Sequence, residues 1–184
     1  QRALQLGDSR TIVDLGTYDD AVHNHDTSQS REIEVDWTLG EALEVSDPLS
    51  NRTYTGTRIA FRVEIAGDKR HQPLVQSLHY SLSEGGPAVL DVGMHRRESG
   101  AKFELTSSEH YKLVRHAGRV WHLPDPVRFY GFPDEAMAYY QNTAFLSDLV
   151  LEFERMTKSM FYVGPLRGYP KRLYLWSGET PDHV

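Results

Sequence analysis

The first two-thirds of the chain alternate between apolar and polar residues, a period of two that is typical of half-buried β-strands. The clearest runs cover residues 33–39, 59–65, 74–82 and 90–94. Weaker signals at 103–105 and 113–120 indicate two or three shorter strands. The pattern predicts a sheet of about six strands.

Short turns that contain glycine separate the central runs. Ala66-Gly67-Asp68-Lys69 and Ser83-Glu84-Gly85-Gly86-Pro87 both have the composition of hairpin connections. Connections this short make consecutive strands antiparallel. We therefore expect an antiparallel β-meander.

The pattern changes after Pro124. Pro133 suits the first turn of a helix, and from 134 to about 158 the apolar residues Phe145, Leu149, Phe153 and Met156 recur three or four apart. Asn142 or Thr143 is expected to cap a second helix within this stretch, and 161–163 reads as a short buried strand. The expected fold class is α+β, divided into a β-subdomain (1–123), a helical segment (124–160) and a strand with tail (161–184).

Composition narrows the class of protein. The 184 residues have a net charge of −6, which argues mildly against nucleic acid as the main partner of this segment. No apolar run is long enough for a membrane span, residues 1–10 show no secretory signal, and the absence of cysteine fits a reducing cytoplasm. We expect a cytoplasmic protein that does not interact with membranes.

The common catalytic signatures are missing from the sequence. It contains neither the Gly-Lys-Ser/Thr of a phosphate-binding P-loop nor Gly-x-Gly-x-x-Gly, His-Glu-x-x-His or Gly-x-Ser-x-Gly. Without cysteine there is also no thiol nucleophile.

One local pattern suggests a metal. His23 and His25 are one residue apart, and two imidazoles on an extended segment can face the same zinc, iron or nickel ion. With Gly16, Glu32 and Gly40 they resemble the cupin motif, although each spacing is a residue or more too long. Solvated loop histidines explain the same residues, and we expect no structural metal.

The tail mixes cations with aromatic residues. Arg167, Lys171 and Arg172 alternate with Tyr169, Tyr174 and Trp176. Such a stretch can stack bases and hold phosphates, or it can be a strand end that packs against other protein.

The same tail carries a family resemblance. Phe161-Tyr162-Val163-Gly164-Pro165-Leu166-Arg167, then Tyr169-Pro170 and Tyr174-x-Trp176-Ser177-Gly178-Glu179, resemble a segment of ABC-type, AAA-named ATPases related to the overcoming-lysogenization-defect family. Residues 13–23 resemble the part that follows the P-loop helix in those proteins. Residues 128–133 with 139–142 resemble the helical entry to their "GPLR" strand.

The resemblance implies that the chain is the antiparallel β-subdomain of an ATPase head. The P-loop would precede residue 13, and the signature, Walker B and switch histidine would follow Val184, so this segment would be inactive alone. ATP and magnesium would be cofactors of the whole protein. Its partners would be the rest of the head and a second protomer, and the whole protein could also bind nucleic acid. The resemblance implies a role in phage defence or in a DNA-related process. Arg167 would lie at the edge of the nucleotide site.

Three functions thus remain open from the sequence: an ATPase segment, a cupin-like metal protein using His23, His25 and Glu32, and a plain β-rich interaction module.

Overall fold

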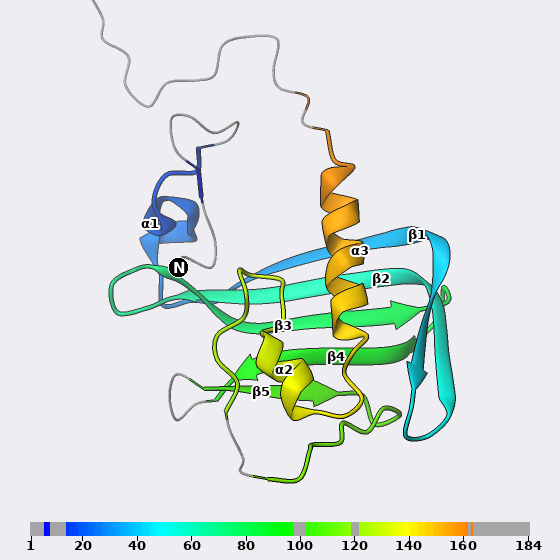
Figure 1. Ribbon diagram of the computed structural model, residues 1–184. Coiled ribbons are helices and arrows are strands. Elements are labelled where there is room, and N and C mark those ends of the chain that lie inside the picture. The colour runs from blue at the N-terminus through cyan, green and yellow to red at the C-terminus, as the bar shows by residue number, and fades with distance from the viewer. Residues whose placement is uncertain (1–5, 8–13, 98–101, 119–121, 162, 164–184) are drawn as a thin grey trace, which may run out of the picture.

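The computed structural model describes residues 6–7, 14–97, 102–118, 122–161 and 163 (Figure 1). Its main element is a five-stranded antiparallel sheet in the order β1-β2-β3-β4-β5. The strands are β1 (Arg31–Asp47), β2 (Arg52–Gly67), β3 (Pro73–Ser83), β4 (Ala88–Arg96) and β5 (Phe103–Ser107). The meander predicted from the sequence is therefore confirmed, and the described residues form five strands where about six were expected.

Helices flank the sheet along the described chain. The short α1 (Tyr18–Ala21) and a 3₁₀ turn (His23–His25) precede the sheet, whereas α2 (Asp134–Tyr139) and α3 (Leu146–Lys158) follow it. Figure 1 shows α3 crossing the sheet, with its last turns extending beyond β1. None of the described helices is long and apolar enough to cross a membrane.

The core lies between one face of the sheet and the helices α2 and α3. Alternate residues of β2, Ile59, Phe61, Val63 and Ile65, are fully or almost fully buried. Phe153 of α3 packs against Phe61 with ring centroids 4.7 Å apart. Burial of such side chains supplies the main driving force for folding, so this helix is fixed to the sheet chiefly by its apolar stripe.

The opposite face of the sheet is polar and partly exposed. Arg62 of β2 pairs with Glu34 of β1 at 3.2 Å, and Arg58 pairs with Asp36 at 2.5 Å. Exposed cross-strand pairs of this kind stabilise a sheet only modestly. The described helices leave this face open.

The expected strand at 113–120 does not join the sheet. Within its described part, Arg115 forms an isolated bridge with Tyr140, and Val114 N donates to the side chain of Asn142 at 3.1 Å. The segment is therefore held by the linker between α2 and α3 and not by β5. The prediction of a sixth strand there was wrong.

The expected helix caps were also wrong. The N-cap of α3 is Phe145, which makes no side-chain cap. Asn142 instead donates to Asp47 and to the carbonyl of Lys112, and Thr143 donates to the carbonyl of Ala136 at 3.0 Å. These side chains satisfy buried groups elsewhere, so they are not available to the helix terminus.

The short buried strand expected at 161–163 is not formed in the described residues. Phe161 and Val163 are 91% and 90% exposed, and neither belongs to a strand. Two apolar side chains this exposed, directly after a helix, mark a surface that other protein can cover.

Candidate functional site

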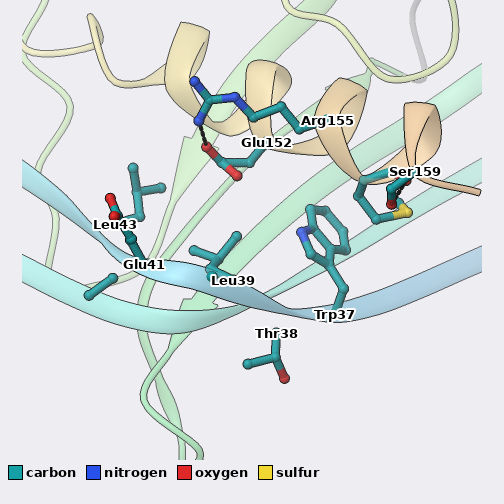
Figure 2. A pocket seen from close by; sticks show the side chains of 11 residues that line it. Trp37, Thr38, Leu39, Glu41, Leu43, Glu152, Arg155 and Ser159 are labelled. Carbon is teal, nitrogen blue, oxygen red and sulfur yellow. Dashed lines mark hydrogen bonds and ion pairs between the residues drawn. The ribbon is translucent and has the colours of Figure 1, made fainter.

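A groove lies between the edge of β1 and the last turns of α3. It encloses about 670 Å³. Figure 2 shows Trp37 and Leu39 extending from β1 toward α3, whereas Thr38 extends to the opposite side of the strand. The lining residues are Trp37, Thr38, Leu39, Gly40, Glu41, Ala42, Leu43, Glu152, Arg155, Met156 and Ser159.

The groove coincides with an irregularity in β1, whose residues line it. Thr38 pairs with Arg58, but Leu43 already pairs with Gly56, so residues 39–42 of β1 face a single residue, Thr57, on β2. Extra residues on one strand bend it and increase its twist. Gly40 lies at this bend, and a Cβ there would meet nothing within 4 Å. The bend is therefore part of the lining of the groove.

The chemistry of the groove is mixed. Trp37 contacts Phe153 edge-on, with ring centroids 6.0 Å apart, which anchors the indole to the core. Across the groove, Arg155 donates to Glu152 at 2.5 Å. Glu41 is the third charged residue of the lining, and no further cation among the lining residues is left to pair with it. An apolar floor with a charged rim suits binding of a polypeptide segment better than chemistry on a small molecule.

A second polar cluster lies on the open face of the sheet. Ser81 donates to Asp91 at 2.5 Å, and His79 Nδ1 is 3.7 Å from the other carboxylate oxygen of Asp91. The polar contact with His79 is the main reason that the pKa of Asp91 is lowered, although burial opposes it. Gly93 lies below the imidazole, because a Cβ there would be 2.3 Å from His79 Nδ1.

This cluster contains serine, histidine and aspartate but lacks the order of a catalytic triad. A nucleophilic serine must donate to the histidine, and the histidine to the acid. Here the Ser81 hydroxyl donates directly to Asp91. The hydroxyl is thus paired with the carboxylate, and the cluster is a polar cross-strand network.

The histidines of the candidate metal motif lie on the surface. His25 Nδ1 is 2.8 Å from the carbonyl oxygen of Asp19, which therefore accepts a hydrogen bond from the ring. Glu32 lies on β1, where its carboxylate is 3.6 Å from Arg62. Among the residues that the structure describes, no group of three or more His, Asp or Glu side chains is placed to hold a metal ion. The geometry gives the metal hypothesis no support.

The segment with these histidines is attached to the sheet at the β2–β3 hairpin. Thr17 and Asp20 form a capping box at the start of α1. The Tyr18 hydroxyl donates to the carbonyl of Ile65 at 3.2 Å, and His71 is 2.8 Å from Asp19. These contacts fix α1 to the β2–β3 hairpin, which accounts for the segment structurally.

Arg167, the residue predicted to lie at a nucleotide site, is outside the described residues. The last described helix before it in the sequence is α3, and Ser159, directly after this helix, lines the groove. The groove itself was not found from the sequence. Its signal was weak: Trp37 and Met156 belong to two separate periodic runs, and periodicity does not reveal which runs meet in space.

Comparison with known proteins gives no further guide to identity. No known family matches the chain, and neither a curated protein nor a solved structure is significantly similar to it.

Proposed function

We propose that this chain is the antiparallel β-subdomain of an ABC-type ATPase head related to the overcoming-lysogenization-defect family. The proposal rests on the resemblance of three stretches, at 13–23, at 128–133 with 139–142, and at 161–179. Its structural support is coarse: an antiparallel meander followed by helices, which is the element order that the resemblance implies.

One observation carries the proposal furthest. Helix α3 ends at Lys158, and Met160, Phe161 and Val163 directly after it are 60%, 91% and 90% exposed. Three apolar side chains exposed together at the start of the "GPLR" stretch favour contact with further protein. In the proposed head, that protein is the remainder of the nucleotide-binding core.

The chain's role in such a head is to support the nucleotide site without forming it. The sequence has no P-loop to hold phosphates, and in the proposed whole protein the P-loop and signature come from other segments and from a second protomer. ATP and magnesium belong to that assembly in the cytoplasm. Nucleic acid remains a proposed partner of the whole protein only.

Arg167 is the residue of this chain that we assign to the edge of the nucleotide site. Proline fixes its own φ and glycine allows close approach of the backbone, so the Gly164-Pro165 pair would favour a stiff and compact turn before Arg167. A guanidinium binds phosphate or carboxylate oxygens with two parallel hydrogen bonds. Arg167 would therefore meet a γ-phosphate or a carboxylate of the partner protomer.

Calorimetry with Mg-ATP tests the division of roles. The chain alone is expected to bind no ATP, whereas the intact gene product is expected to bind and hydrolyse it. A micromolar dissociation constant for the isolated chain would contradict the proposal, since it would require a complete site within these residues.

A β-rich interaction module is the second candidate function, and the groove between β1 and α3 favours it. Its apolar floor and free strand edge offer a peptide-binding surface without any nucleotide chemistry. An intact gene product that neither binds nor hydrolyses ATP would favour this function over the first.

A further inference from the structure

The outer edge of β1 has no neighbour among the described residues. β1 is the first strand in the sheet order and pairs only with β2. A free edge presents a row of backbone N–H and C=O groups on which another strand can add. At 17 residues, β1 is the longest described strand, and it therefore offers the largest such edge.

Helix α3 turns this edge into a slot. The helix passes over β1, and its last turns extend beyond it (Figure 1). Met156 in these turns and Ser159 directly after them line the groove. Figure 2 shows Ser159 on the α3 side of the groove, across from Trp37 and Leu39. Adjacent strands lie about 4.8 Å apart. A strand added beside β1 would thus lie under the overhanging part of α3.

The two faces of β1 define what such a strand needs. Toward α3, the strand presents Trp37 and Leu39, which are partly buried against the core. On the opposite face it presents Glu32, Glu34 and Asp36, which among the described residues pair with two cations, Arg58 and Arg62. A matching strand has apolar side chains on its α3 side and a cation on its other side.

The chain itself contains a sequence with this pattern. After Val163 it continues to Val184 and includes Lys171-Arg172-Leu173-Tyr174-Leu175-Trp176. Leu173 and Leu175 share one side of an extended segment, and Arg172 shares the other with Tyr174 and Trp176. An extended residue spans about 3.4 Å, so residues 160–170 reach roughly 35 Å, enough to turn back along β1.

We propose that residues 171–176 bind along the free edge of β1, beneath α3, as an additional strand of the sheet. Leu173 and Leu175 then lie against Trp37, Leu39 and Met156. Arg172 lies on the acidic face near Glu34 and Asp36, with Tyr174 and Trp176 on the same, partly solvated face. Lys171, on the leucine side, lies toward the acidic rim of the groove.

This occupant is favoured over a second copy of the chain. Two antiparallel copies of β1 would bring Glu32, Glu34 and Asp36 of one copy close to the same acids of the other, and like charges in neighbouring positions destabilise strand pairing. The tail is also tethered beside the slot, because the chain leaves α3 at Ser159. Tethering gives an effective concentration in the millimolar range.

The absence of cysteine allows a clean cross-linking test. Thr38→Cys, on the polar face of β1, is combined with Tyr174→Cys in the full chain, and disulfide formation under mild oxidation is followed by intact mass and non-reducing electrophoresis. Thr106→Cys with Tyr174→Cys is the matched control. Thr106 lies on the same face of the sheet but on β5, at the opposite edge.

The expected result is an intramolecular disulfide that forms at least tenfold faster from Thr38→Cys than from Thr106→Cys. Adding Leu173→Asp and Leu175→Asp to the Thr38→Cys pair should remove this advantage, while circular dichroism shows an unchanged fold. Equal rates at the two edges, insensitivity to the aspartates, or disulfides formed only between chains would each overturn the proposal. The inference goes beyond the proposed function, because no nucleotide enters the test and ATPase activity does not affect its outcome.

Discussion

Asn142 Nδ2 donates a hydrogen bond to Oδ1 of Asp47 at 3.2 Å, which joins the linker between α2 and α3 to the β1–β2 hairpin. Asp47 is only 5% exposed and also accepts hydrogen bonds from Leu49 N and the Ser50 hydroxyl. The pair therefore fixes the helical part of the chain to one end of the sheet through a buried polar contact.

Replacing Asn142 should destabilise the fold. Asn142→Ala removes one hydrogen-bond partner each from Asp47, the Lys112 carbonyl and Val114 N, and buried groups left unsatisfied cost about 1–3 kcal/mol. Urea denaturation measures the loss. Gln141→Ala is the control, because Gln141 is exposed and water can replace its side-chain hydrogen bond to the Arg115 carbonyl; exposed changes of this kind stay within about 0.5 kcal/mol. Equal losses for the two variants would show that the buried network adds nothing.

The same contact makes the stability of the fold depend on pH in the acidic range. Burial alone would raise the pKa of Asp47, but hydrogen bonds from Ser50, Leu49 N and Asn142 together outweigh it and hold the pKa below its ordinary value. A carboxyl whose pKa is lower in the folded state stabilises the fold above the unfolded pKa, about 3.9. This stabilisation is lost as pH falls through the folded pKa.

Asp47→Asn should therefore flatten the acid limb of the stability curve. Between pH 6 and pH 2.5, the wild-type free energy of unfolding should fall further than that of the variant. The other acids with lowered pKa, such as Asp26, Asp68 and Asp91, are present in both proteins and cancel in the comparison. Parallel curves would contradict the assignment to Asp47.

Gly93 is expected to tolerate no side chain. A Cβ there would be 2.5 Å from the Leu78 carbonyl oxygen as well as 2.3 Å from His79 Nδ1, and a backbone contact cannot be relieved by rotating a side chain. Overpacking of this kind costs about 1–3 kcal/mol, so Gly93→Ala should lower the thermal midpoint. Gly86→Ala, where a Cβ meets nothing within 4 Å, should leave it nearly unchanged.

Removal of the His79 ring distinguishes the two steric contacts that a Cβ at position 93 would make, with His79 and with the Leu78 carbonyl. In a His79→Ala background, Gly93→Ala should still destabilise the protein, because the Leu78 carbonyl remains. Complete rescue by His79→Ala would show that the imidazole alone sets the requirement for glycine.

Phe153 is predicted to be the most sensitive residue of α3. Its ring contacts Trp37, Phe61, Tyr80, Phe129 and Tyr130, so Phe153→Ala leaves a cavity at the junction of helix and sheet. The expected loss is about 3–5 kcal/mol. Leu151→Ala, at a position 43% exposed, should cost far less. A small effect at Phe153 would mean that α3 is held elsewhere.

The elements that the sequence predicted are those with strong local periodicity. Ile59, Phe61, Val63 and Ile65 alternate without interruption, and the glycine-bearing turns on either side of β3 fix its direction, so β2 to β4 follow from local signals. Likewise, Phe145, Leu149 and Phe153 recur at the period of a helix, which located α3.

What the sequence did not predict depends on contacts between distant residues. Asn142 is a residue type that often caps helices, but its side-chain amide donates instead to Asp47, which is 95 residues away in the sequence. The groove requires Trp37 and Met156 to meet across a bend in β1, and neither residue carries a local mark of that bend. Leu113 looks like part of a strand but lies on the segment that Asn142 holds.

We propose that this chain supports the nucleotide site of an ATPase head, and the turnover of the intact gene product carrying Arg167→Ala is the most direct test. We expect ATP hydrolysis by the wild type and a loss of about tenfold in the variant, equivalent to about 1.4 kcal/mol of transition-state stabilisation. Arg70→Ala, in the exposed β2–β3 turn, serves as the control and should retain full turnover. No hydrolysis by the wild type, or unchanged turnover in a well-folded Arg167→Ala variant, would contradict this proposal.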